Sequence, residues 1–135
     1  ETEDETLSRM TIVTRGDERI IEQVTKQLNR LIDVVKVTDL TETTHVEREL
    51  VLVKVAAATA QIRTEVTQLV EVFRANVVDI SSGTITVEVT GNEDKIDALI
   101  GMLDPYGIRE MARSGVIALG REKASHRISE SARVA

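Results

Sequence analysis

The 135-residue sequence predicts an α+β protein made of two ferredoxin-like modules, the first of them incomplete. Runs of β-branched residues alternate along the chain with segments whose apolar residues recur at spacings of three and four. The first pattern is typical of strands and the second of amphipathic helices. In the second half these elements follow the order βαββαβ, which predicts an antiparallel four-stranded sheet with both helices on one face.

The first module is predicted within residues 1–41 and contains a strand, a helix and a second strand. The β-branched run 9–14 predicts the first strand, and residues 34–37 predict the second. Asp17 is the expected N-cap of the helix between them, because its carboxylate can accept hydrogen bonds from the free amides of the first turn. The apolar stripe of this helix consists of Ile21, Val24, Leu28 and Leu31.

The second module is predicted within residues 46–120 and contains all six elements. Strands are expected at 49–57, 77–81, 84–90 and 108–118, and helices at 60–73 and 92–103. Thr59 is the expected N-cap of the first of these helices. Ser114 and Gly115 predict a bend or bulge within the last strand. Residues 121–135 have no apolar pattern, and we expect them to form a flexible tail.

An internal repeat relates the two modules. When residue n is aligned with residue n + 75, Gly16 falls on Gly91 and Glu18 on Glu93, and the apolar stripes of the helices coincide. The repeat predicts that the first module lacks its opening strand, helix and second strand, about 30 residues that would precede residue 1. A strand–helix–strand remnant leaves sheet edges uncovered, so we expect an upstream segment or a partner to cover it.

The composition disfavours several classes of function. The net charge is −6, with one Phe, one Tyr and no Trp, whereas nucleic-acid binding usually requires a basic surface or aromatic stacking platforms. The absence of Cys excludes disulfides and thiolate metal sites, and the apolar runs are too short to cross a membrane. The acidic N-terminus is unlike a signal peptide. We therefore expect a soluble cytoplasmic protein that binds neither nucleic acid nor membrane.

Two groups of residues are candidates for chemistry, and each also has a structural explanation. His45, Glu47 and Glu49 alternate and would share one face of a strand, where they could bind a divalent cation. We favour the explanation that these three side chains are only solvated, over a metal site, because a soft ligand set is absent. Ser114 precedes Gly115 but lacks the base and oxyanion hole that a nucleophile needs, so a bend is favoured there. The sequence therefore predicts no catalytic residue and no metal site.

Several separated blocks of the sequence, in the same order, resemble one protein family. They are LSRMTIVTRGDE, EQVTKQLNRLIDVVKV, HVERELVLVKV, FRANVVDIS and GIREMARSGVIALGR, and they run from about Leu7 to Arg121. These blocks are similar to the small regulatory subunit of acetohydroxyacid (acetolactate) synthase, an ACT-domain family. The resemblance implies an N-terminal ACT domain followed by a C-terminal ferredoxin-like domain.

The resemblance also implies a function. Members of this family are not enzymes themselves; they pair as dimers through their ACT domains and bind a larger catalytic subunit that carries thiamine diphosphate, Mg²⁺ and FAD. They raise its activity and confer feedback inhibition by a branched-chain amino acid, commonly valine. No cofactor is expected on the chain itself. The effector would lie beside the loop after the first ACT strand, in the segment predicted to precede residue 1, so the effector-binding residues are unknown.

The last block suggests a surface for the catalytic subunit. Arg113, Ser114 and Gly115 are unusual residues for a strand, and we predict that they bind the partner, with a structural bulge as the alternative explanation. Two other functions remain open for the whole chain. One is a stand-alone ACT-type amino-acid sensor, and the other is a small ferredoxin-like enzyme, which would need a cluster of polar residues in a pocket.

Overall fold

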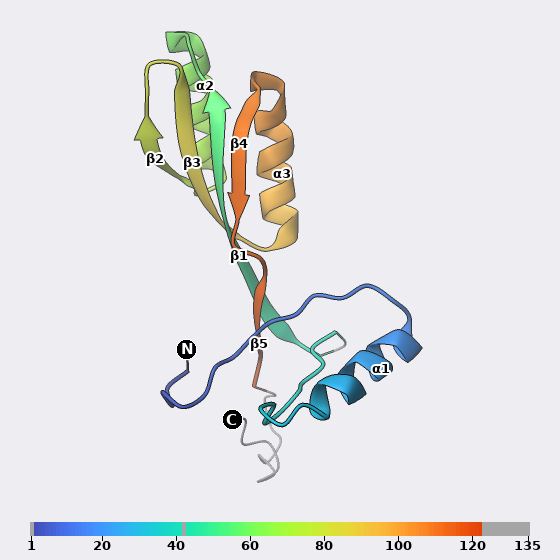
Figure 1. Ribbon diagram of the computed structural model, residues 1–135. Helices are drawn as coiled ribbons and strands as arrows, with labels where there is room; N and C mark the ends of the chain where they lie inside the picture. Colours follow the sequence, from blue (N-terminus) through green and yellow to red (C-terminus); the bar gives the residue numbers. More distant parts are fainter. Residues whose placement is uncertain (1, 42, 123–135) are drawn as a thin grey trace. The chain divides into compact units, whose positions relative to one another are not determined.

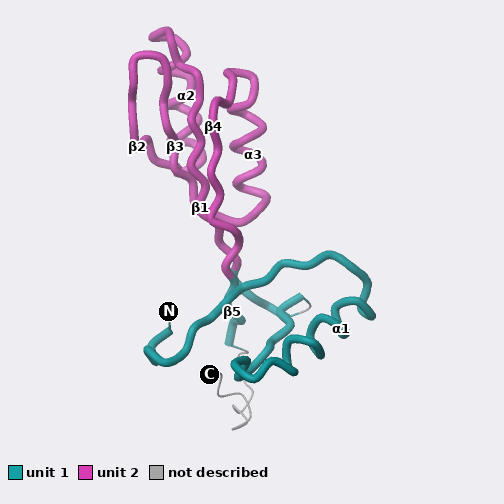
Figure 2. Tube along the Cα trace, in the orientation of Figure 1, with its two compact units in different colours: residues 1–46, 118–135 teal, residues 47–117 magenta. Residues whose placement is uncertain are grey.

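A computed structural model describes the chain at residues 2–41 and 43–122. The chain divides into two compact units, coloured separately in Figure 2. Unit 1 comprises residues 1–46 and 118–135, and unit 2 comprises residues 47–117.

The predicted second module, 46–120, extends past unit 2 at residues 118–120. Those residues belong to unit 1, in which the backbone amide of Arg121 donates a hydrogen bond to the carbonyl of Thr44 (2.9 Å). The predicted flexible tail, 121–135, lies outside the described residues from position 123 onward.

Unit 2 has the βαββαβ order that the sequence predicts (Figure 1). The strands are β1 (His45–Ala56), β2 (Asn76–Ile80), β3 (Thr84–Gly91) and β4 (Ile108–Arg113), and the helices are α2 (Ala60–Val72) and α3 (Glu93–Leu103). A short 3-10 helix, η1 (Asp104–Tyr106), leads into β4, and a further strand, β5 (Ile117–Gly120), pairs with β1. The four main strands lie in the order β2-β3-β1-β4, and each neighbouring pair is antiparallel. The predicted α+β fold is confirmed.

The hydrophobic core of unit 2 lies on one face of this sheet. Alternate residues of the two central strands point into it, and both helices pack against them. The buried apolar residues are Val51, Val53 and Val55 of β1, Ile85, Val87 and Val89 of β3, Ala57, Val66 and Val70 of α2 and the loop before it, and Ile96, Leu99 and Leu103 of α3. Because α2 and α3 share this core, they cover the same face, as the sequence predicts. Burial of these aliphatic side chains is the main force that holds the helices on the sheet.

The predicted N-caps are confirmed. The side chain of Thr59 accepts a hydrogen bond from the amide of Ile62 (3.2 Å) at the start of α2. Capping satisfies amides that have no partner within the helix, and this fixes where each helix begins. None of the helices in the described part of the chain has the length and apolar character that crossing a membrane requires.

The internal repeat is visible in the local structure of its two helix starts. Asp17 accepts a hydrogen bond from the amide of Ile20, and Asn92 accepts one from the amide of Lys95, each at 3.0 Å. The two caps also share one backbone conformation, with φ and ψ of −76° and 176° at Asp17 and −78° and 173° at Asn92. The aligned residues therefore have the same role in the two modules.

Unit 1 contains helix α1 (Glu18–Asn29), as predicted, but neither of the two strands predicted beside it. Residues 9–14 and 34–37 are all described, and none of them is in a strand. A β-branched run forms a strand only where a neighbouring strand hydrogen-bonds to it. Here Val13 and Val35 are 70% and 65% exposed instead. The prediction of these two strands was wrong.

Candidate functional site

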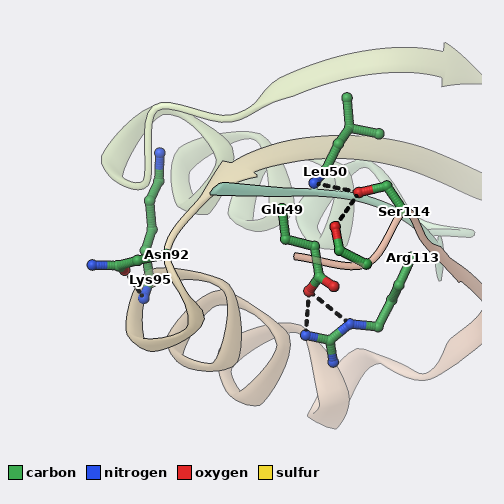
Figure 3. Close-up of polar contacts among 7 residues, drawn as sticks. Glu49, Leu50, Asn92, Lys95, Arg113 and Ser114 are labelled. Atoms are coloured by element: carbon green, nitrogen blue, oxygen red, sulfur yellow. Dashed lines mark hydrogen bonds and ion pairs between the residues drawn. The ribbon is translucent and has the colours of Figure 1, made fainter. Parts of the chain in front are cut away.

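The residues predicted to bind the partner lie where β4 ends beside β1 (Figure 3). Arg113 is the last residue of β4 and pairs with Val51. Ser114 extends the ladder by one residue: its amide donates to the carbonyl of Leu50 (2.9 Å), and its Oγ accepts from the amide of Leu50 (3.0 Å). The Ser114 hydroxyl itself donates to the carbonyl of Gly115 (2.9 Å). Ser114 thus satisfies both backbone groups of Leu50, which would otherwise lack partners at the end of the strand pair.

Gly115 allows the chain to turn after β4. Its φ is +84°, in the left-handed region that residues with a Cβ rarely adopt. Apart from the adjoining residues, no atom lies within 4 Å of the position that a Cβ would occupy, so the backbone conformation, and not crowding, favours glycine here. The predicted bend is confirmed, because β4 stops at Arg113 and β5 begins at Ile117.

Glu49 and Arg113 form a partly buried ion pair beside this turn (Figure 3). Glu49 is 7% exposed, and both Nε (2.9 Å) and Nη2 of Arg113 donate to its Oε1. Glu49 alternates along β1 with buried Val51, so it lies on the covered face of the sheet. The prediction that Glu49 is solvated together with His45 and Glu47 was therefore wrong. A buried carboxylate requires a compensating charge, and Arg113 supplies it.

The surroundings of Arg113 keep its guanidinium charged. The hydrogen bond to Glu49 raises the pKa of Arg113 above its usual value. Partial burial acts in the opposite direction, and the negative charges of Glu49, Asp97 and Glu93 raise the pKa further. Asp97 and Glu93 belong to α3, so the ion pair is electrostatically coupled to that helix as well as to both strands.

These contacts determine what the site can do chemically. Ser114 Oγ is hydrogen-bonded to backbone groups, which is the role of a strand-end residue. Among the described residues, no group of three His, Cys, Asp or Glu side chains is placed to hold a metal ion. The side chain of Arg113 is 43% exposed, so part of the guanidinium remains accessible to another protein. Partner binding by Arg113, Ser114 and Gly115 stays a prediction.

Arg63 of α2 has a structural role that the sequence analysis missed. Its Nε donates to the carbonyl of Ala57 (2.9 Å), and its Nη2 donates to the carbonyls of Ser81 and Ser82 (2.7 Å each). The side chain therefore ties the turn between β2 and β3 to the helix. Its partners are backbone carbonyls up to 19 residues away, so the sequence pattern offers no signal that separates this arginine from a solvated one.

Tyr106 gives a direct spectroscopic test of the contact between η1 and α2. Its hydroxyl donates to Glu65 Oε2 (2.8 Å), and this hydrogen bond, more than desolvation and the charge of Glu65, raises the pKa of Tyr106 above its usual value of 10.0. Tyr106 is the only tyrosine and the chain has no Trp, so an ultraviolet absorbance titration reports this phenol alone. We expect a midpoint above 10.0 in the folded protein and a lower midpoint in Glu65→Gln.

The sign of the linked stability follows from this shift. Because the folded-state pKa is raised, the contribution is fully present below pH 10.0 and is lost as the pH rises through the folded pKa. A wild-type midpoint at or below 10.0, or one that Glu65→Gln leaves unchanged, would contradict the hydrogen bond.

Two family models match the chain in sequence order. Residues 1–36 match a model described as the AHAS small subunit-like ACT domain, and residues 48–122 match the small subunit of acetolactate synthase. Together with the antiparallel sheet of unit 2, these matches define the class: an α+β protein with an ACT-like fold.

Curated relatives agree with these models. The acetolactate synthase small subunit of Aquifex aeolicus is 56% identical over 122 residues, which cover 90% of this chain and 64% of that protein. The one from Bacillus subtilis is 51% identical over 128 residues, covering 92% and 74% of the two chains. A probable acetolactate synthase small subunit from Methanothermobacter thermautotrophicus is 50% identical over 121 residues, covering 90% and 72%. The chain spans 64% of the length of the Aquifex aeolicus relative.

A solved structure is also similar. The crystal structure of the acetolactate synthase small subunit from Thermotoga maritima superposes with a TM-score of 0.72 at 38% sequence identity, covering 82% of this chain and 68% of that one. The chain belongs to the family of acetolactate synthase small subunits.

Proposed function

We propose that the chain is a non-catalytic regulatory subunit. It binds the thiamine-diphosphate-dependent catalytic subunit of acetohydroxyacid synthase, activates it, and makes it sensitive to feedback inhibition by a branched-chain amino acid, with valine as the expected effector. The observation that carries this proposal is the match of two small-subunit family models, in chain order, over residues 1–36 and 48–122.

The proposal divides the work between two proteins. Thiamine diphosphate, Mg²⁺ and FAD belong to the catalytic subunit, and this chain acts by binding it in the cytoplasm as a dimer formed through ACT domains. A regulatory subunit can change the activity of its partner only if it binds one state of that partner more tightly than another. Feedback inhibition further requires that the effector changes this preference from a separate site.

Reconstitution tests the proposal. The purified chain alone is expected to form no acetolactate from pyruvate, and adding it to the catalytic subunit of the same organism is expected to raise kcat. Acetolactate formation is the measurement. Valine titration is carried out in parallel on residues 1–135 and on a version extended upstream, because the effector loop is predicted to precede residue 1.

The outcomes separate the proposed function from its rivals. Acetolactate formation by the chain alone would show that it is an enzyme. Saturable valine binding by a chain that neither binds nor activates the catalytic subunit would favour the stand-alone sensor. Activation by residues 1–135, with valine inhibition only in the extended version, would support both the function and the predicted place of the effector site.

A further inference from the structure

One face of the sheet in unit 2 is not covered by the helices of that unit. Leu50 and Leu52 alternate along β1 with the buried valines, so they lie on the face opposite α2 and α3. They are 40% and 37% exposed. In the register of the sheet, Leu50 pairs with Thr90 of β3, and Leu52 pairs with Ala112 of β4. We call this surface the outer face, and its centre is aliphatic.

Acidic residues lie beside this aliphatic centre at its Leu52 end, whereas Arg48 lies next to Leu50 on the same face of β1. One row across the strands contains Asp79, Lys54 and Glu110. Glu110 lies on β4, next to the strand of Lys54, and Asp79 lies two strands away on β2. Glu88 lies in the next row, directly beside Leu52. The two rows therefore hold three carboxylates and one ammonium group, an imbalance toward negative charge.

Lys54, the single cation of these two rows, already forms an ion pair with a carboxylate of the same face. Lys54 Nζ forms an ion pair with Glu110, and its pKa is raised first by that hydrogen bond and to a smaller extent by the charge of Asp79. The side chain of Glu88, by contrast, makes no hydrogen bond or ion pair with any residue in the described part of the chain. The unbalanced charge of the outer face therefore lies beside the exposed leucines.

We propose that the outer face is a docking surface for the catalytic subunit. The matching patch on that subunit places aliphatic side chains against Leu50 and Leu52, and Arg or Lys side chains opposite Glu88 and Asp79. This inference rests on the proposed function, which supplies the identity of the partner. A second copy of this chain fits less well, because it would bring the same excess of carboxylates to the interface, and like charges placed opposite each other oppose association. A basic rim around an apolar centre complements both features of the face.

Affinity for the catalytic subunit tests the proposal, measured by calorimetry with the whole chain. Two variants alter the outer face: Leu52→Glu, which places a charge in the aliphatic centre, and Glu88→Lys, which reverses the unpaired charge. Two matched controls make the same changes on the helical side of the unit: Val72→Glu, at a side chain 76% exposed on α2, and Glu71→Lys next to it. We expect each outer-face variant to weaken binding at least about tenfold and each control to change it less than about twofold.

Salt dependence distinguishes the charge from the apolar contact. Raising the ionic strength is expected to reduce the difference between wild type and Glu88→Lys, because exposed charges are screened, and to leave the difference for Leu52→Glu nearly unchanged. Circular dichroism confirms that each variant is folded, and Leu52→Thr, a milder change that suits an exposed strand, replaces Leu52→Glu if that variant is not.

The failure of this inference can be told apart from failure of the proposed function. If the wild-type chain binds and activates the catalytic subunit but the outer-face variants bind as well as their controls, the docking surface lies elsewhere and the function stands. If Leu52→Glu dissociates a homodimer in sedimentation and leaves the affinity for the catalytic subunit unchanged, the occupant is a second copy and the inference is overturned. If the wild-type chain does not bind the catalytic subunit, both are overturned.

Discussion

Replacing Arg113 with Met is expected to lower the free energy of unfolding by about 3 kcal/mol, because it leaves a buried carboxylate without its counter-charge. Glu49 is 7% exposed and receives two hydrogen bonds from the guanidinium. Loss of one partner from a fully buried ion pair costs about 3–5 kcal/mol. The Arg113 side chain is 43% exposed, so water can partly replace it, and the lower end of that range applies.

Chemical denaturation followed by the fluorescence of Tyr106, the only tyrosine and a residue of unit 2, measures this loss. Arg109→Met is the matched control: it makes the same substitution on the same strand at an exposed arginine that has no ion pair in the described part of the chain. The double variant Glu49→Gln with Arg113→Met is expected to recover part of the loss, because a buried amide costs less than a buried charge. Equal losses in Arg113→Met and Arg109→Met would show that the ion pair does not stabilise the fold.

The elements of unit 2 could be predicted because their signals are local. The alternation in 84–90 places Ile85, Val87 and Val89 on one face of β3. A cap such as Thr59 and the spacing of the apolar residues then fix the start and the buried face of a helix. Each of these signals lies within one element and is independent of its neighbours. They were therefore enough to predict the order and the type of all six main elements.

The errors concern features that depend on distant residues. The run 9–14 has the composition of a strand, but a strand also needs a hydrogen-bonded neighbour, and composition cannot supply one. Glu49 was predicted to be solvated because its partner, Arg113, is 64 positions away in the sequence. One local signal was available, since Glu49 shares its side of β1 with the buried valines. A charged residue in that position indicates a buried pair whose second member must come from another element.

In the candidate site, too, the local feature could be predicted from the sequence and the contacts between strands could not. Gly115 indicated a bend, and its positive φ agrees with that reading. The hydrogen bonds of Ser114 to Leu50 could not be predicted, because they depend on the register between β1 and β4. The charge imbalance of the outer face likewise depends on register, which brings Glu88 of β3 beside Leu52 of β1. Residue types could be assigned to strands from the sequence, but neighbours across strands could not.

The two faces of the sheet are expected to respond very differently to the loss of a leucine side chain. Leu99 of α3 is fully buried in the core, and Leu99→Ala is expected to lower the free energy of unfolding by about 3–4 kcal/mol, because the transfer of the side chain is lost and a cavity remains. Leu52 lies on the outer face and is 37% exposed. Leu52→Ala is expected to cost about 1 kcal/mol or less, since less apolar surface is buried there and water fills the space.

Denaturation of the two variants under identical conditions gives this comparison directly, again with Tyr106 as the probe. A large difference would mean that Leu52 adds little to the stability of the isolated chain, so that its effect on binding to the catalytic subunit can be measured in a protein that remains folded. Similar losses in both variants would mean that the outer face is covered by another part of the chain in solution. In that case the leucines of β1 belong to an intramolecular core, and they are not available to a partner.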